Sequence, residues 1–312
     1  MMTSTEDFAR LADPFRHELL VHCYRMLGSV HDAEDTVQET FLQAWRAYDG
    51  FEGRSSLRTW LYRIATNACL KALEKGKRRP LPHGLGTAPG DPDEPLAEPE
   101  REVLWLQPFP TPAETVDARQ TTRLALIAAL QHLPPRQRAV LILRDVLMWR
   151  ADEVADLLDI TTPAVNSLVQ RARAHVGDLS QDDVLEPDDP VAVSVVDRLM
   201  KAFENADNAA LMRLLTDDAV WEMPPIPTWF TGPAAIGRFL ATLWCIAPEN
   251  VKFVRITAND QPALAWWLRD RPGGVYQAHC IEVLTVTTDG IKHAISFMDS
   301  ALFPAFGLPM TR

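Results

Sequence analysis

The chain has 312 residues, which is more than a single hydrophobic core usually serves, so we expect at least two domains. Hydrophobic residues make up 47% and charged residues 23%, and no apolar run is long enough to span a bilayer. The formal net charge is −11, and the acidic first residues lack the apolar stretch of a signal peptide, which predicts a cytoplasmic protein. The four cysteines are scattered without a C-x-x-C pair, so we expect free thiols, no metal site and no cofactor.

Residues 8–79 combine helical periodicity with positive charge. Apolar residues recur at helical spacing in two stretches, and the Gly-bearing loop between these stretches ends in Ser55 and Ser56, which can cap the second helix. From residue 54 to residue 80 there are eight Lys or Arg residues and one acid, Glu74. Such a block is either a solvated helix face or a surface that meets a polyanion.

Residues 81–117 form a different segment, which is acidic, rich in proline and without regular periodicity. This composition predicts a linker. One stretch within it, VLWLQPFP at residues 103–110, is apolar, and a flexible spacer would not normally carry so much apolar surface.

Residues 118–180 return to helical spacing and end in two short helices, ADEVADLLD and TPAVNSLVQRARAHV. Thr161 or Thr162 can cap the second of these helices, and Asp159 can take the place of the usual turn glycine because Asp tolerates left-handed backbone. One face of the second helix is apolar, and the opposite face carries polar side chains with Arg173 among them. This is the layout of a helix-turn-helix whose second helix can enter a major groove.

The sequence pattern of residues 190–312 predicts an α+β domain. Two short helices within 191–215 and a third over 232–244 precede four strand-like stretches, VKFVRITA, PALAWWLR, VYQAHCIEVLTVTT and IKHAISFMD. Helices followed by antiparallel strands predict a curved sheet wrapped over the helices.

The sequence also resembles a known family. DAEDTVQETFLQAWRAYDGFEGRSSLRTWLYRIATNACL is similar to the core-binding and −10-reading region of group 4 (extracytoplasmic-function) sigma-70 factors, and ALQHLPPRQRAVLILRDVLMWRADEVADLLDITTPAVNSLVQRARA is similar to their −35-reading region. The last third of the chain resembles the SnoaL-like, NTF2-like fold that is appended to a subset of these factors. The resemblance implies a multidomain protein with two all-α sigma modules, 1–80 and 118–180, a Pro-rich linker, 81–117, and a cone-shaped α+β regulatory domain with a curved antiparallel sheet, 190–312.

The resemblance implies an RNA polymerase sigma factor that is not an enzyme. It would bind core RNA polymerase through the clamp helices of the largest subunit and direct promoter-specific initiation, with the C-terminal domain modulating activity and no membrane involved. The candidates for polymerase contact share one acidic helix, whose alternative role is an ordinary solvated face: Asp32, Glu34, Asp35, Gln38 and Glu39.

The resemblance also implies two DNA-reading surfaces. The −10 surface needs a loop, aromatic walls and cations, although Phe51 and Trp60 can instead belong to the core, for Trp60 with equal weight. Its candidates are Phe51, Arg54, Ser55, Arg58, Trp60, Arg63, Asn67 and Lys71. The −35 candidates lie on the second helix of the helix-turn-helix: Thr162, Asn166, Ser167, Gln170, Arg171 and Arg173. We expect the two arginines among them to anchor phosphates rather than to read bases.

The apolar linker stretch and the C-terminal domain leave alternatives open. We expect Trp105, Leu106 and Pro108 to dock on the C-terminal domain; the alternatives are packing on the first module or contact with the polymerase. The C-terminal domain is either regulatory, with a small ligand as a candidate partner, or a cyclase- or isomerase-like enzyme that makes the protein bifunctional. Met223 stands where the isomerases carry their catalytic aspartate, which argues against their chemistry. The remaining polar candidates are Glu222, His279, His293 and Asp299, and an apolar pocket poor in carboxylates would favour the regulatory role.

Overall fold

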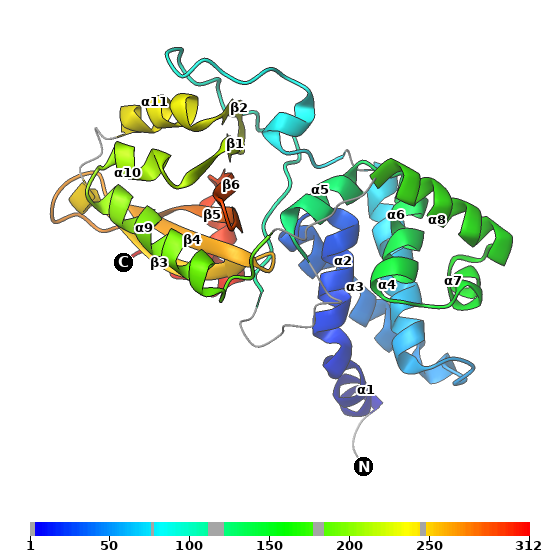
Figure 1. Ribbon diagram of the computed structural model, residues 1–312. Helices are drawn as coiled ribbons and strands as arrows, with labels where there is room; N and C mark the ends of the chain where they lie inside the picture. Colours follow the sequence, from blue (N-terminus) through cyan, green and yellow to red (C-terminus); the bar gives the residue numbers. More distant parts are fainter. Residues whose placement is uncertain (1–3, 76–77, 112–121, 177–183, 244–247) are drawn as a thin grey trace. The chain divides into compact units, whose positions relative to one another are not determined.

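The computed structural model describes residues 4–75, 78–111, 122–176, 184–243 and 248–312 (Figure 1). The chain divides into two compact units. The first contains Met1–Arg79 and Asp117–Leu179, and the second contains Pro80–Val116 and Ser180–Arg312, so the linker belongs with the C-terminal domain. The boundaries predicted at residues 117 and 180 lie outside the described residues.

The first unit begins with four helices: α1 (Ser4–Ala12), α2 (Arg16–Leu27), α3 (Val30–Ala47) and α4 (Leu57–Lys75). Their starts follow local capping chemistry. The Ser29 hydroxyl accepts the Asp32 amide hydrogen at the start of α3 (3.1 Å), and the Ser56 hydroxyl accepts the Thr59 amide hydrogen at the start of α4 (3.0 Å). The predicted cap at Ser56 is therefore confirmed.

The second helical group of this unit comprises α5 (Leu124–Gln131), α6 (Pro135–Leu141), α7 (Ala151–Leu158) and α8 (Thr162–Val176). The stretch expected to continue as one helix after Pro135 changes into a π-helical turn at Ile142–Val146. Asp159 ends α7 with φ at 52°, as the helix-turn-helix prediction requires, and the Thr161 hydroxyl accepts the Ala164 amide hydrogen at the start of α8 (3.4 Å).

Buried contacts join the two helical groups within the first unit. The Arg138 side chain of α6 is 3% exposed and donates to the Met26 carbonyl of α2 and to the Gln131 side-chain oxygen. The rings of Tyr62 on α4 and Trp149 stand 5.2 Å apart. Burial lowers the pKa of Arg138 to about 10, so this guanidinium remains charged at neutral pH.

The second unit is the expected α+β domain. Its helices are α9 (Pro190–Glu204), α10 (Asn208–Met212) and α11 (Pro233–Leu243). Its six strands are β1 (Leu215–Met223), β2 (Ile226–Thr231), β3 (Val251–Ala258), β4 (Gln261–Leu268), β5 (Gln277–Thr287) and β6 (Gly290–Phe297). They form one curved sheet in the order β2-β1-β6-β5-β4-β3. Neighbouring strands are antiparallel except β1 and β6, which are parallel, so the sheet is not purely antiparallel.

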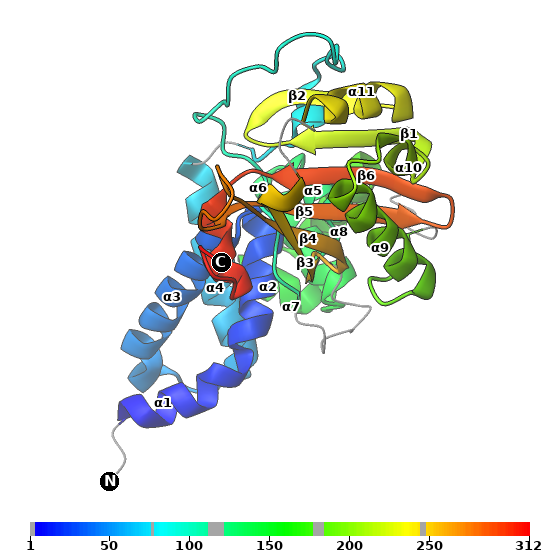
Figure 2. The ribbon, with the colours of Figure 1, turned by 90° about the vertical axis from the view of Figure 1, so that its left-hand side faces the viewer.

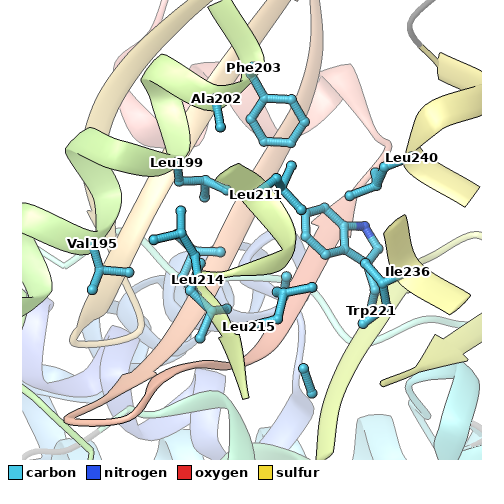
Figure 3. Close-up of a cluster of buried hydrophobic side chains, with 14 of the residues drawn as sticks. Val195, Leu199, Ala202, Phe203, Leu211, Leu214, Leu215, Trp221, Ile236 and Leu240 are labelled. Atoms are coloured by element: carbon cyan, nitrogen blue, oxygen red, sulfur yellow. The ribbon is translucent and has the colours of Figure 1, made fainter. Parts of the chain in front are cut away.

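The helices α9, α10 and α11 gather against the sheet and bury the core of this domain (Figures 1 and 2). Figure 3 shows Leu199 and Phe203 of α9 and Ile236 and Leu240 of α11 directed toward Trp221 of β1. These side chains are all less than 10% exposed. Because the core occupies one face of the sheet, alternate residues of β1 are directed to the other face.

Among the described residues, no helix has both the length and the apolar character needed to cross a membrane.

Candidate nucleic-acid interface and linker contacts

The outward face of α8 carries the residues predicted to read the −35 element. Thr162, Asn166, Ser167, Gln170 and Arg171 are exposed, while Val165, Val169 and Ala172 turn into the core. Because positions four apart lie on one side of a helix, Asn166 and Gln170 stand one above the other. They line a shallow surface hollow together with Arg144, Val169 and Arg173.

The two arginines of this face differ in their surroundings. Arg173 makes a two-pronged ion pair with Asp145 of the preceding π-helical turn, with nitrogen–oxygen distances of 2.8 and 2.7 Å, which raises the pKa of Arg173. Arg171 is exposed and donates to the Ser167 carbonyl within its own helix. Arg144, which the sequence prediction did not include, lines the same hollow and donates to the Trp149 carbonyl.

The predicted −10 surface is brought together along the start of α4 and the loop before it. Arg54 and Ser55 are exposed in the loop, and Arg63, Asn67 and Lys71 are exposed on α4, at positions that repeat every three to four residues. Phe51 and Trp60 are half-buried, and their rings stack on one another with centroids 4.7 Å apart. Trp60 is therefore packed on one side and accessible on the other, which accommodates both of the roles considered for it.

Two cations of this surface are engaged inside the first unit. Arg58 lies on another side of α4 and pairs with Glu18 of α2, with nitrogen–oxygen distances of 2.7 and 2.9 Å, while its guanidinium stacks over the Tyr62 ring. This ion pair orients Arg58 toward α2, away from Arg63, Asn67 and Lys71, and its place on the −10 surface stays a prediction. Arg63 donates to the Asp156 carbonyl of α7.

The acidic face of α3 continues into apolar side chains. Asp35, Gln38 and Glu39 are exposed, and the apolar side chains of Leu42 and Trp45 are 40% and 44% exposed. Leu42 lies seven residues after Asp35, and this spacing could have placed both on the same side. Glu34 is half-buried, and Asp32 is paired with Arg79, so neither is as accessible as the other acids of this helix.

The linker runs along the sheet of the second unit and makes repeated hydrogen bonds to it. The amides of Gly90 and Glu100 donate to the carbonyls of Trp229 (2.8 Å) and Pro225 (2.9 Å), and the Ala97 amide donates to the Thr228 hydroxyl (3.1 Å). Figures 1 and 2 show this segment, in cyan to green, beside β2.

The end of the linker is held at the β3–β4 turn by a reciprocal pair of hydrogen bonds. The Phe109 amide donates to Asn259 Oδ1, and the Asn259 amide donates to the Phe109 carbonyl, both at 2.8 Å. Both residues are no more than 2% exposed, and Pro110 forms a β-bridge with Ala258. We call these contacts, together with those of residues 90–100, the linker clamp.

The three residues predicted to dock lie just before Phe109 and differ in exposure. Leu106 and Pro108 are buried, while Trp105 is half-buried and donates its indole hydrogen to the Glu100 carbonyl of the linker itself (2.9 Å). The contact between the linker and the C-terminal domain that the structure describes most fully is therefore made by Phe109, a member of the same apolar stretch.

A polar cluster lies where the linker begins to follow the sheet. The short 3₁₀ turn η3 (Pro82–Leu85) packs on β1 and β2, and from it His83 reaches Glu222 of β1. His83 Nδ1 and His293 Nε2 stand 2.9 and 2.6 Å from the same carboxylate oxygen, Oε1, and the His83 amide donates to Oε2 at 2.8 Å. Burial raises the pKa of Glu222, but the hydrogen bonds from His293 and His83 outweigh it and lower the pKa to about 2.

The opposite face of the sheet encloses an apolar pocket. Its lining includes Trp221, Met223, Phe239 and Trp266, with Leu96 contributed by the linker, and none of the described residues that line it is a carboxylate. Of the four polar candidates named from the sequence, His279 lines this pocket, and burial lowers its pKa. The other three have different places: Glu222 and His293 belong to the polar cluster, and Asp299 accepts the Ala301 amide hydrogen at the start of a 3₁₀ turn.

A buried acid that the sequence prediction missed lies on β5. Glu282 is fully buried and accepts a hydrogen bond from Ser296, a pocket residue, at 3.1 Å. Burial raises the pKa of Glu282 to about 8, with the hydrogen bond from Ser296 opposing the shift, so the group is mostly uncharged at neutral pH. Its position two residues after the pocket residue Cys280 on the same strand is a signal that strand alternation could have provided.

Comparison with known proteins assigns three parts of the chain to families. Residues 11–79 match Sigma-70 region 2, residues 123–176 match Sigma-70 region 4, and residues 196–294 match the SnoaL-like domain. The ECF RNA polymerase sigma factor SigG of Mycobacterium tuberculosis is 48% identical over 314 residues, covering 97% of this chain and 84% of SigG. The chain belongs to the ECF RNA polymerase sigma factors.

Other relatives of this ECF sigma factor agree in family and in fold. SigJ of M. tuberculosis is 31% identical over 210 residues, covering 67% of this chain and 62% of SigJ, and SigW of Bacillus subtilis is 30% identical over 168 residues, covering 53% and 84%. The crystal structure of M. tuberculosis SigJ has the same fold, with a TM-score of 0.64 at 22% identity over 98% of this chain and 99% of that one. Sigma factors are not enzymes, and none of these matches supports the alternative of a catalytic C-terminal domain.

Proposed function

We propose that the C-terminal domain of this ECF sigma factor regulates initiation by holding the linker between its two DNA-reading modules. As a sigma factor the protein binds core RNA polymerase and directs it to promoters, and we place this activity in the cytoplasm, where the polymerase works. The proposal concerns which residues make these contacts and what the C-terminal domain adds.

Each module has a surface suited to one task. The exposed side of α3, with Asp35 and Glu39 beside Leu42 and Trp45, offers acidic and apolar side chains for docking on the polymerase. The stacked pair of Phe51 and Trp60 can receive an unstacked base of the −10 element, with the cations of α4 beside it for the phosphates.

The −35 element is assigned to the outward face of α8. Asn166 and Gln170 can make paired hydrogen bonds to base edges in the major groove, as amide side chains commonly do to adenine. Arg171 and Arg173 lie along the same helix, and we assign them to phosphates; the ion pair with Asp145 already orients the Arg173 guanidinium.

The linker clamp is the observation that carries the regulatory role. Hydrogen bonds from residues 90, 97, 100 and 109 of the linker go to β2, the preceding turn and the β3–β4 turn. Each such bond contributes about 0.5–1.5 kcal/mol net, so together they hold the linker with several kcal/mol. A linker held at both ends of this stretch cannot extend freely, and its reach between the two modules is shortened.

A ligand in the apolar pocket would be a second influence on the linker clamp. Leu96 of the linker forms part of the pocket wall, so a small apolar ligand that fills the pocket would contact the linker directly. Such a ligand would strengthen the clamp if it packs on Leu96 and weaken it if it displaces Leu96.

The test is transcription with purified core polymerase, the full-length protein and promoter DNA. We expect promoter-specific initiation by the complex and little specific binding by the protein on DNA alone. Asn259→Gly removes the acceptor of the Phe109 amide but suits the positive φ of 55° at this position, whereas the control Asp260→Asn, at the neighbouring positive φ of 54°, leaves that acceptor in place.

Under the proposal Asn259→Gly changes initiation and Asp260→Asn does not. If both variants initiate as the unaltered protein does, the clamp has no regulatory role. If the full-length protein fails to direct the core enzyme to any promoter but binds duplex DNA tightly and specifically by itself, the assignment of its DNA surfaces is wrong.

A further inference from the structure

The polar cluster of His83, Glu222 and His293 is unusual in how its three side chains converge. Both imidazole rings approach the same oxygen, Glu222 Oε1, rather than sharing the two carboxylate oxygens between them. Their planes are turned by 79° and their centroids are 5.8 Å apart, so the two ring nitrogens face one point from different directions.

The remaining carboxylate oxygen has a separate partner. Glu222 Oε2 accepts the His83 amide hydrogen at 2.8 Å, which fixes the plane of the carboxylate and directs Oε1 toward the two rings. An outer hydrogen bond that orients a ligand in this way is a regular feature of protein metal sites.

A buried carboxylate such as that of Glu222 is destabilising unless strong hydrogen-bond donors or a cation accompany it. The Glu222 side chain is fully buried, whereas His293 is 22% and His83 is 48% exposed. Glu222 alternates along β1 with the pocket residues Trp221 and Met223, so it is directed to the face of the sheet that the linker turn covers. The cluster therefore reaches solvent through its two histidine rings and not through the carboxylate.

We propose that His83, Glu222 and His293 form a binding site for a divalent cation of the zinc class, which joins the linker to the C-terminal domain. The three ligand atoms, His83 Nδ1, a Glu222 oxygen and His293 Nε2, lie within 4.8 Å of one another. Two imidazole nitrogens and one carboxylate are a donor set that binds Zn²⁺ with a fourth position open to water.

The geometry needs only a small adjustment to accept the ion. Tetrahedral coordination with bonds of about 2.0–2.1 Å places neighbouring donor atoms about 3.3 Å apart. The present separations of 2.9 and 2.6 Å to Oε1 therefore widen by about half an ångström on binding, and the two ring nitrogens, now within 4.8 Å of one another, settle at about the same spacing; rotation of the half-exposed His83 ring can provide this movement. The ion takes the place of the protons between the ring nitrogens and Oε1: a neutral ring carries its proton on the other nitrogen and a charged ring releases one, so binding weakens in acid.

The site has a consequence for the linker because its ligands come from two parts of the second unit. His83 belongs to the start of the linker, whereas Glu222 and His293 belong to adjacent strands of the sheet. Metal binding would fasten the linker some seven residues before the first hydrogen bond of the linker clamp at Gly90. Metal binding rests on the geometry alone, while an effect of metal on transcription rests on the proposed function of the clamp.

The experiment is a titration of the metal-stripped full-length protein with Zn²⁺ by calorimetry and with Co²⁺ by visible absorption. We expect saturable binding at one site, with the absorption bands of Co²⁺ bound to nitrogen and oxygen ligands. His83→Gln and His293→Gln should each lower the affinity by about 100-fold or more, since even the loss of an outer hydrogen bond costs 10- to 100-fold. His17→Gln is the matched control, because His17 is an exposed histidine of α2 in the other unit.

If His293→Gln, in strand β6, folds poorly, His83→Gln still tests the metal site, because His83 lies in a surface turn and not in the sheet. Hydrogen exchange of the linker gives a second readout: Zn²⁺ should slow exchange of the His83 amide in the unaltered protein and not in His83→Gln. Absence of binding by the unaltered protein, or equal affinity in it and in both variants, overturns the proposal. Binding that is lost in both variants, combined with unchanged initiation by Asn259→Gly, would uphold the metal site and reject the regulatory clamp.

Discussion

A methyl group added at Gly90 is the sharpest perturbation of the linker clamp. An added Cβ would stand 2.6 Å from the Thr228 methyl carbon and 3.3 Å from the Phe230 ring, closer than packed carbon atoms allow. Gly90→Ala therefore either lifts the linker from β2 or forces Thr228 aside, and overpacking of this kind costs about 1–3 kcal/mol. The hydrogen bond from the Gly90 amide to the Trp229 carbonyl is the contact most directly strained.

The assay is hydrogen exchange of the linker amides in the full-length protein. Since 1.4 kcal/mol corresponds to a tenfold change, we expect the amides of residues 90 and 97 to exchange about 5- to 150-fold faster in Gly90→Ala. Amides of the first unit, such as that of Thr59 at the start of α4, serve as an internal reference and should not change.

A second substitution identifies the cause. Thr228→Ser removes the methyl group that clashes but keeps the hydroxyl that accepts the Ala97 amide hydrogen. We expect it to have little effect alone and to return the exchange rates of Gly90→Ala to within a fewfold of the original. Unchanged exchange in Gly90→Ala would refute the packing of the linker on β2, and failure of Thr228→Ser to rescue would refute Thr228 as the contact.

Three further predictions concern other sites. Gln170→Ala should change which −35 bases are preferred, whereas Arg173→Ala should weaken promoter use evenly across −35 variants by about 1–3 kcal/mol, and a panel of promoter variants distinguishes the two patterns. Trp45→Ala should lower affinity for core polymerase without lowering the melting temperature, because this side chain is 44% exposed; unchanged affinity in a direct binding assay would remove it from the interface. The pKa of Glu282 is raised from 4.5 to about 8 in the fold, so the unfolded chain loses this proton first and stability falls as the pH rises from about 4.5 to 8, by about 3 kcal/mol at pH 7 at most. Glu282→Gln should remove that part of the pH dependence in urea unfolding of the C-terminal domain, and an unaltered pH profile would contradict the assignment.

Local sequence information was sufficient for the helix-turn-helix. The spacing of Val165, Val169 and Ala172 and the left-handed position at Asp159 are decided within one or two helical turns, and the structure shows both. Strand β2 was missed because it is short and contains Pro227, which argues against a strand in the middle of a sheet. It lies at the edge of the sheet, where a missing amide hydrogen is tolerated.

The contacts of the linker could not be predicted in the same way. His83 and Glu222 are 139 residues apart, and no periodic signal connects a turn in a Pro-rich segment with one strand residue. The face of the sheet on which Glu222 lies could have been predicted, however. If Met223 takes the pocket position, strand alternation directs Glu222 to the opposite face, which excludes it as a pocket acid and leaves it for whatever covers that face.

The surface of α3 shows a related limit of prediction from sequence. Helical spacing alone does not tell whether Leu42 and Trp45 lie on the buried or the exposed side of α3, since apolar side chains are usually assigned to the core. In the structure both are exposed beside Asp35 and Glu39, which suits the polymerase contact proposed for this helix.

The most direct test of the account measures transcription as a function of promoter spacing. Core polymerase with the full-length protein is compared with Asn259→Gly and with a chain that ends at residue 189, on promoters whose −10 and −35 elements are separated by increasing distances. The account predicts one narrow spacing optimum for the unaltered protein and a broadened or shifted optimum for both altered chains, because each releases the linker. An identical spacing profile for all three would contradict the claim that the C-terminal domain controls initiation through the linker.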